Sequence, residues 1–263
     1  MISIKYNGRL GNQIYQYCFG RILSSNLNMD LDSSLDEFDG AGSVYLGRSI
    51  HRPQITLSGH VVDINSINPN YGYHLDGYFQ RFEYYKHHKE DIKKWLKIEK
   101  NYRKPGKEDL VVHVRGGDLY QWNRPDQVHP QHIPLPLKHY VDIIKKSQFK
   151  NLFVVCEKSD DPIGVEISKL YNCEIVSQSV IEDFYFIKES KKIVLSTCSL
   201  AWWASWISEA EEIHFPLAGF WHPESERNDM DVIVDESRYK YYDLGVNDHW
   251  SGTKEELERI KKL

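Results

Sequence analysis

The amino-acid sequence predicts an α/β protein built around a parallel β-sheet, and three observations support this. Residues 2–25 have the pattern of a strand, a glycine turn and a helix, which opens an α/β unit. From residue 110 onward, short apolar runs alternate with helical patterns. The 263 residues, 41% of them hydrophobic, suffice for one large domain or two small ones. The alternation predicts a doubly wound sheet with helices on both faces.

The N-terminal part begins with a predicted strand at residues 2–6, where apolar and polar residues alternate. A helix follows, with apolar residues at helical spacing from Ile14 to Ile22. Residues 32–70 show little periodicity and predict loops and short strands, whereas residues 82–96 predict an amphipathic helix. The stretch 101–109 contains Pro-Gly among charged residues and predicts a linker.

The second part predicts the parallel sheet itself. Expected strands are 110–114, 151–156, 173–177, 192–195 and 213–216, and expected helices are 137–147, 162–171, 181–190, 200–208 and 254–263. We therefore divide the chain into an N-terminal Rossmann-like domain (1–105), a ligand-binding domain (106–235) and a C-terminal helical segment (236–263). Packing of that last segment against the N-terminal half is one arrangement open to it.

Composition excludes several classes of protein. The net charge is −5 and the pI about 6.2, without the basic excess of a nucleic-acid binder. No apolar run approaches the ~18 residues that cross a bilayer, and the N-terminus lacks a signal-peptide pattern. The four cysteines lack metal-site spacing, so we expect reduced, buried thiols in a cytoplasmic protein and no bound metal. The sequence does not predict an oligomeric state.

The first motif of interest is His113-Val114-Arg115-Gly116-Gly117-Asp118, at the end of a predicted buried strand. A guanidinium is a planar fork suited to phosphate, and glycines let the backbone approach a ligand. The motif therefore predicts a pyrophosphate site. The alternative is an ion pair between Arg115 and Asp118 within a glycine turn.

Two further motifs also join a strand to a helix. Gly8-Arg9-Leu10-Gly11-Asn12-Gln13 places backbone N–H groups at a helix start, although a plain tight turn explains it equally. Ser196-Thr197-Cys198-Ser199-Leu200 offers hydroxyls and helix N-terminal amides to a phosphate. An ordinary helix cap is the alternative there, and Trp202 and Trp203 are predicted to belong to the core.

A fourth feature is Glu182-Asp183 at the start of a predicted helix. Acidic residues at this position usually cap the helix, and the sequence alone favours that role. A carboxylate is also a double acceptor, so it could bind the N1–H and the amine of a guanine.

Taken together, the motifs resemble glycosyltransferase family 11, the α-1,2-fucosyltransferases. That family has a Gly-Gly-Leu-Gly-Asn-Gln-type turn, a Gly-Tyr-Phe-Gln segment, a His-x-Arg-Arg-Gly-Asp motif and a late Ser/Thr-Phe-Ser-Trp-Trp segment. The counterparts in this chain are Gly8 to Gln13, Gly77 to Gln80, His113 to Asp118 and Cys198 to Trp203. Their order and spacing hold over residues 2–222. The opening turn also resembles that of the protein O-fucosyltransferases.

The resemblance implies a GT-B-like fold, in which two Rossmann-like halves face each other across a donor cleft. It implies an inverting, metal-independent transfer of L-fucose from GDP-β-L-fucose to a glycan hydroxyl, with α-1,2 linkage to galactose. Arg115 would then hold the β-phosphate, His113 would lie by the nucleotide and Asp183 would bind guanine. Ser199, with the amides of its neighbours Cys198 and Leu200, would hold the phosphates. Gly11 and Asn12 would approach from the other half.

The chain also departs from the family pattern. The family's second arginine is Gly116 here, Arg9 replaces a glycine, and Leu200 replaces an aromatic residue. Arg9 is therefore a candidate for the missing charge. We expect Arg115 to stabilise the leaving group and Asp118 to act as base, with bracing of Arg115 as its alternative role and His129 as another acceptor-side residue. Another GDP-deoxyhexose donor, or a non-catalytic GDP-sugar or glycan binder, are the alternative functions.

Overall fold

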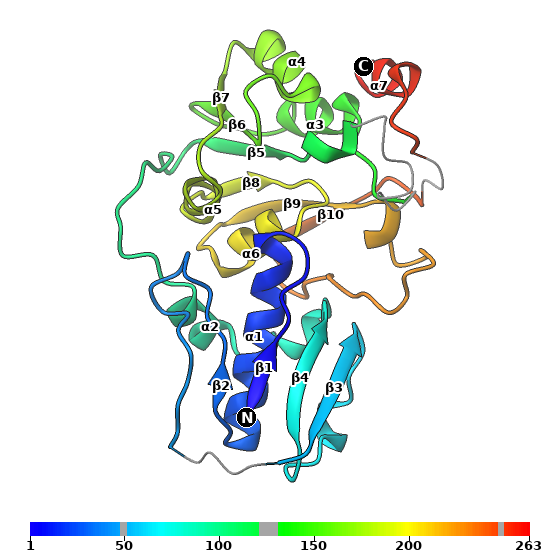
Figure 1. Cartoon of the computed structure of the whole chain (residues 1–263). Coiled ribbons are helices and arrows are strands. Elements are labelled where there is room, and N and C mark those ends of the chain that lie inside the picture. The colour runs from blue at the N-terminus through cyan, green and yellow to red at the C-terminus, as the bar shows by residue number, and fades with distance from the viewer. Residues whose placement is uncertain (48–51, 121–130, 247–249) are drawn as a thin grey trace. The chain divides into compact units, whose positions relative to one another are not determined.

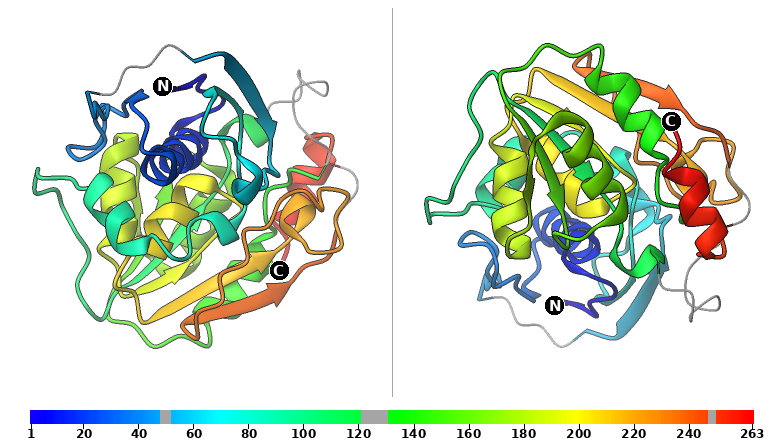
Figure 2. Two further views of the ribbon diagram at one scale, coloured as in Figure 1. Left: turned by 90° about the horizontal axis from the view of Figure 1, so that it is seen from below. Right: turned by 90° about the horizontal axis from the view of Figure 1, so that it is seen from above.

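A computed structural model describes residues 1–47, 52–120, 131–246 and 250–263 (Figures 1 and 2). The chain divides into two compact units. Unit 1 comprises Met1–Asn101 and Asp229–Ile233, and unit 2 comprises Tyr102–Asn228 and Val234–Leu263. The division falls at the start of the polar stretch 101–109.

Unit 1 is a parallel sheet of four strands in the order β2-β1-β4-β3. Its elements are β1 (Ile2–Ile4), α1 (Leu10–Leu27), β2 (Leu31–Asp32), β3 (Gln54–Gly59), β4 (Gly72–Gly77) and α2 (Lys89–Trp95), with 3₁₀ turns at Ile64–Ser66 and Phe82–Tyr84. The predicted opening of strand, turn and helix is confirmed. The helix expected over 82–96 is instead a 3₁₀ turn followed by the shorter α2.

The long helix α1 owes its boundaries and position to its sequence. It buries the apolar residues that predicted it, including Ile14, Tyr17 and Ile22. It ends at Asn28, which adopts a left-handed conformation (φ 51°) and donates its backbone N–H to the carbonyls of Ser24 and Ser25. Such a residue closes a helix because it satisfies carbonyls of the last turn.

Unit 2 is a parallel sheet of six strands in the order β10-β9-β8-β5-β6-β7. Its elements are β5 (Leu110–Val114), α3 (Leu137–Ile144), β6 (Leu152–Cys156), α4 (Pro162–Tyr171), β7 (Glu174–Val176), α5 (Val180–Lys188), β8 (Lys192–Val194), α6 (Ser199–Ile207), β9 (Glu212–Leu217), β10 (Tyr239–Asp243) and α7 (Lys254–Ile260), with 3₁₀ turns at Gly117–Tyr120 and Gly219–Trp221. The predicted parallel sheet is confirmed. The strand β10 corrects the expectation of a helical segment over 236–263, in which only α7 is helical among the described residues.

The two faces of this sheet are covered by different helices. In Figure 1, α3 and α4 lie on one face of unit 2, and α5 and α6 on the other. Because side chains alternate along a strand, Val112 and Val114 join the core on the α3–α4 side. His113, between them in the sequence, therefore points to the face that carries α6.

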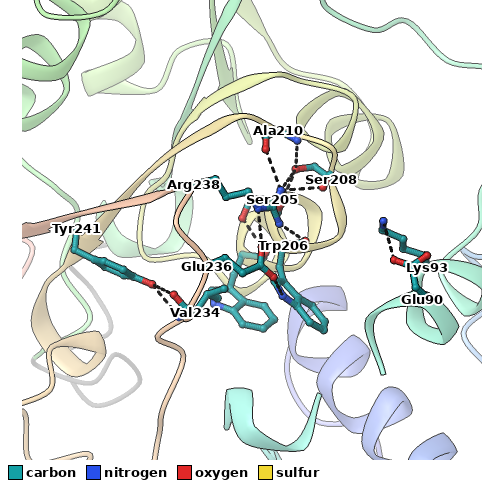
Figure 3. A network of polar contacts seen from close by, with 11 residues as sticks. Glu90, Lys93, Ser205, Trp206, Ser208, Ala210, Val234, Glu236, Arg238 and Tyr241 are labelled. Carbon is teal, nitrogen blue, oxygen red and sulfur yellow. Dashed lines mark hydrogen bonds and ion pairs between the residues drawn. The ribbon is translucent and has the colours of Figure 1, made fainter. Parts of the chain in front are cut away.

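Helix α6 is anchored in the core and tied down at its C-terminal end. Trp202, Trp203 and Trp206 are completely buried and pack edge-on or tilted with centroids 4.9–5.6 Å apart, which confirms their core role. Arg238 donates to the carbonyl of Trp206 at 2.6 Å and to that of Ser208 at 2.9 Å (Figure 3). These carbonyls lack helical partners, so the guanidinium satisfies them and fixes the end of the helix.

A buried histidine in unit 2 makes stability depend on pH. His139 in α3 is 6% exposed, and its Nε2 has no hydrogen-bond partner among the described residues. Burial, with repulsion from His214 and against the opposing pull of Asp142, lowers the pKa of His139 to about 4. The unfolded chain binds a proton near pH 6.5. Stability from this group is therefore complete above that pH and lost as the pH falls toward 4.

We predict that the free energy of unfolding falls by about 3 kcal/mol between pH 7 and pH 4 on account of His139. His139→Leu should flatten this dependence, because the group that takes up a proton on unfolding is gone. Urea titrations across that pH range, followed by tryptophan fluorescence, measure the effect. The exposed His87 supplies a control in His87→Gln, which should leave the slope unchanged. An equal slope in wild type and His139→Leu would contradict the prediction.

Candidate functional site

The order of strands in unit 2 singles out one place on its sheet. From β5 the chain passes to β6 and β7 on one side and then returns to place β8 on the other side of β5. Ligands of open α/β sheets bind where the strand order reverses, at the carboxyl ends of the strands. The motif at 113–118 follows β5, and the motif at 196–200 follows β8. The structure therefore brings these two predicted motifs to one edge, at the reversal point.

His113 connects the two motifs directly. Its Nδ1 lies 2.7 Å from the hydroxyl oxygen of Ser196, and both residues are buried. This contact joins the end of β5 to the loop after β8 and so fixes the distance between the two segments. The role of His113 beside a nucleotide stays a prediction.

The loop after β8 leads straight into helix α6. Cys198 is its N-cap residue in extended conformation, and Ser199 and Leu200 open the first turn. No acidic residue lies in that turn. A helix N-terminus with no carboxylate of its own carries partial positive charge toward an anion. The three predicted positions thus gather where a phosphate would be stabilised.

Arg115 is held by two carboxylates. It pairs with Asp118, lies 3.6 Å from Glu157 and donates to the carbonyl of Gly116 at 2.6 Å. Its side chain is only 12% exposed. An ion pair between Arg115 and Asp118 was the alternative that the sequence left open, and the structure contains it. A phosphate that binds this guanidinium therefore has to compete with the two carboxylates.

The space beside Gly116 is already filled. A Cβ atom added there would lie 1.9 Å from Asp161 Oδ2 and 2.4 Å from Tyr120 Cε2. The other oxygen of Asp161 cannot move freely, because it accepts from the N–H groups of Ile163 and Gly164 at 3.0 Å each, capping α4. Residue 116 is a glycine here because the cap of α4 occupies the volume that a side chain would need.

Two buried carboxylates, those of Asp183 and Asp161, lie near His113 at this edge. Burial raises the pKa of Asp183 to about 6, opposed by the backbone N–H of Gln178 and by His113. Burial also raises the pKa of Asp161, against its two backbone hydrogen bonds. The cap of α5 is formed by Glu182, which accepts from the N–H of Ser179 at 3.1 Å. The cap that the sequence favoured for this pair of acids is therefore confirmed for Glu182, whereas Asp183 is buried near His113 and accepts from the backbone N–H of Gln178 at 3.2 Å.

Unit 1 joins two other predicted segments at the carboxyl edge of its own sheet. Gln80, from the Gly-Tyr-Phe-Gln segment after β4, donates its side-chain amide to Asn12 Oδ1 at 2.9 Å. Asn12 and Gly11 lie in the first turn of α1, and Arg9 is its N-cap residue. Gly8 adopts φ 75°, which permits the tight turn before that helix.

A further cluster, not predicted from the sequence, lies on the same edge of unit 1. His60 follows β3, stacks on the ring of Tyr78 at 5.6 Å and lies 3.8 Å from the carboxylate of Asp229. The sequence held one signal for this cluster, because His60 is a polar residue directly after a strand that ends in glycine. Asp229 is far away in the sequence and no local pattern connects it. His129, the other proposed acceptor-side residue, lies outside the described residues.

The cysteines and possible metal ligands complete the inventory of reactive groups. All four cysteines are free, but only Cys18 and Cys156 are buried; Cys173 and Cys198 are half-buried, so the expectation of four buried thiols is wrong. Within the residues that the structure describes, no three His, Cys, Asp or Glu side chains gather as metal ligands.

We predict that Gly116→Ala lowers the free energy of unfolding by about 1–3 kcal/mol, because the new methyl group overpacks the cap of α4. Chemical denaturation measures the change. Gly42→Ala is the matched control, since a Cβ there meets no atom within 4 Å, and it should be neutral or slightly stabilising. Equal effects of the two substitutions would show that Asp161 and Tyr120 do not constrain position 116.

Comparison with known proteins identifies the family of the chain. No curated protein sequence matches the chain. In the parts of the chain that the structure describes, none of the helices combines the length and apolar character needed to traverse a bilayer. The family model described as Glycosyl transferase family 11 matches residues 50–241, which include the segments after β4, β5 and β8. The chain therefore belongs to glycosyl transferase family 11 and is a glycosyltransferase that acts on donor and acceptor sugar substrates.

Proposed function

We propose that this protein transfers L-fucose from GDP-β-L-fucose to a glycan hydroxyl, with inversion and without a metal, on a GT-B-like scaffold. The α-1,2 linkage to galactose is the regiochemistry that the family resemblance suggests. One observation carries the proposal: an arginine, a histidine, hydroxyl residues and a helix N-terminus gather at the reversal point of the sheet in unit 2. This is a set of groups suited to a pyrophosphate.

In this proposal the pyrophosphate of the donor replaces the carboxylates on Arg115. A phosphate offers the guanidinium a bidentate, charge-assisted pair of hydrogen bonds, in place of the hydrogen bond to Asp118 and the ion pair with Glu157. The backbone N–H groups of Ser199 and Leu200 donate to the remaining phosphate oxygens at the start of α6, and the N–H of Cys198, which donates to the carbonyl of Ser196 at 2.8 Å, exchanges that bond for the phosphate. The exchange couples donor binding to release of Asp118.

Asp183 is proposed to bind the guanine base. Guanine presents N1–H and an amine as neighbouring donors, and an ionised carboxylate accepts both. With a pKa of about 6, the Asp183 carboxyl is largely ionised at pH 7. Because the Asp183 carboxylate is buried beside His113, a ligand that binds there has to supply hydrogen-bond donors to it and exclude water.

The same exchange explains how the reaction would proceed. The bond from fucose to the β-phosphate breaks through an oxocarbenium-like transition state, and negative charge grows on the departing GDP. Arg115 stabilises that charge. Asp118, freed from the guanidinium, accepts the proton of the acceptor hydroxyl. Arg9, Gly11 and Asn12 of unit 1 are proposed to contact the donor from the other half, with Arg9 adding the positive charge that Gly116 lacks.

Metal independence is part of the proposal and has support from local contacts. Two Asp-x-Asp pairs occur in unit 1, Asp30 with Asp32 and Asp229 with Asp231. Three of their carboxylates accept local hydrogen bonds, from Leu46 N, Tyr45 Oη and Ile233 N. The fourth lies beside His60. These local contacts assign the four carboxylates to the fold of unit 1.

The donor itself is tested by thermal shift with GDP, GDP-fucose, GDP-mannose and UDP-sugars, in the presence of EDTA. A donor at 100 times its dissociation constant adds about 2.7 kcal/mol of stability. We expect stabilisation by GDP and GDP-fucose but not by UDP-sugars. Stabilisation by GDP with a stronger response to a different GDP-deoxyhexose would support the alternative donor. Binding without GDP release in the presence of β-galactoside acceptors would support a non-catalytic binder.

We predict that Arg115→Ala reduces turnover with GDP-fucose by about 10²–10³-fold, because charge on the leaving GDP loses its fixed cation. GDP release measures the rate. Arg103→Ala is the matched control: Arg103 also pairs with a carboxylate in unit 2, that of Glu174, but at the start of β7 and hence at the opposite edge of the sheet. The control should retain normal turnover. Near-normal turnover in folded Arg115→Ala would refute the assignment.

A further inference from the structure

Gln178 lies at the carboxyl edge of unit 2 and has no role in the proposed function. It is the second residue after β7 and directly precedes Ser179, the N-cap residue of α5. Its side chain is half-buried, and the amide nitrogen Nε2 is covered by the protein yet has no hydrogen-bond partner among the described residues. A covered N–H donor without an acceptor costs free energy, so a bound molecule has to supply the acceptor.

The backbone of Gln178 is hydrogen-bonded to the residue proposed to bind guanine. Its N–H donates to Asp183 Oδ1 at 3.2 Å, and Asp183 is only 7% exposed. A carboxylate has about four acceptor positions, so this bond leaves most of them for a ligand. Burial raises the pKa of Asp183 to about 6, and the backbone and side chain of Gln178 both oppose that rise, although Nε2 completes no hydrogen bond. An amide donor and a carboxylate acceptor therefore lie close together at the start of α5.

This pair of groups complements one edge of a guanine base. The edge presents three groups in a row: the O6 acceptor, the N1–H donor and the 2-amine donor. A carboxylate accepts from the two donors, and a neighbouring amide N–H donates to O6. Adenine has an amine in the place of O6 and an acceptor at N1, so it matches neither the amide nor the carboxylate. The two side chains together thus distinguish the purines at both positions.

The order of the strands gives a nucleotide a direction along this edge. β8, β5, β6 and β7 are consecutive neighbours in the sheet, so β7 lies three strand spacings, or about 14 Å, from β8. The segments proposed to bind the phosphates follow β8 and β5, whereas Gln178 follows β7. Helices α5 and α6, which carry Asp183 and Ser199, pack against each other on one face of the sheet (Figure 1). A nucleotide with its phosphates at the start of α6 can therefore extend its base toward Gln178.

We propose that Gln178 is a specificity-determining residue for the nucleotide: its side-chain amide donates to O6 of guanine, while Asp183 accepts from N1–H and the 2-amine. This inference rests on the proposed function, because it assigns a further contact to the base of the same donor. It adds a requirement that the Asp183 carboxylate does not impose, namely an acceptor at position 6 of the purine. The contact involves the base alone, so GDP without its sugar is a sufficient probe.

Calorimetric titration of the full-length protein with GDP, IDP and 6-thioguanosine diphosphate tests the O6 contact. IDP lacks only the 2-amine, and the thio analogue replaces O6 by sulfur, a weaker acceptor. We expect wild type to bind each analogue roughly 2–12-fold more weakly than GDP, the effect of one hydrogen bond. Gln178→Met should bind GDP more weakly by a similar factor. In that variant the preference for GDP over the thio analogue should disappear, whereas the preference over IDP should remain, because Asp183 still accepts from the 2-amine.

Gln148→Met is the matched control for the loss of a glutamine amide. Gln148 is exposed and lies between α3 and β6, at the opposite edge of the sheet, so this variant should bind all three nucleotides as wild type does. Urea denaturation without nucleotide separates recognition from a structural role. Because Nε2 of Gln178 has no partner among the described residues, Gln178→Met should leave the denaturation midpoint unchanged or raise it. Gln178→Glu, which places an acceptor opposite O6, is the second variant and should weaken GDP binding further.

The outcomes separate this contact from the proposed function. If folded Gln178→Met prefers GDP over the thio analogue as strongly as wild type does, the assignment of Gln178 is overturned and GDP stands as the nucleotide of the donor. If wild type binds ADP or UDP as tightly as GDP, the proposed donor is contradicted, and the contact of Gln178 with it. A lowered denaturation midpoint with unchanged nucleotide discrimination would assign Gln178 to the fold alone.

Discussion

The pairing of β5 with β8 is the contact on which the candidate site depends. Residues 110–112 of β5 pair with residues 192–194 of β8, although 82 residues separate Leu110 from Lys192. Had β8 continued beyond β7, the loops after β5 and β8 would end at distant points of the edge. Because β8 returns to the other side of β5, His113 meets Ser196, and the first turn of α6 lies beside the motif that follows β5.

Acidic side chains outnumber basic ones at this edge. Arg115 has two carboxylates as partners, Asp118 and Glu157, and two further acids, Asp161 and Asp183, lie behind. A second arginine at position 116 would improve the balance for a pyrophosphate, but the cap of α4 excludes any side chain there. Binding of an anion at this edge therefore depends more on neutral hydrogen-bond donors, namely the hydroxyls and amides at the start of α6. Neutral donors bind phosphate without attracting carboxylates in its absence.

Periodicity predicted most of the secondary structure of unit 2, including β5 and α4 with their observed boundaries, because apolar runs and caps there are strong. It missed β10, whose sequence Tyr-Lys-Tyr-Tyr-Asp lacks an apolar run, since an edge strand buries little. The motifs predicted candidate residues at this edge but not their partners. Glu157 and Asp161 became visible only once β6 lay beside β5, because a pairing of strands is not written in local sequence.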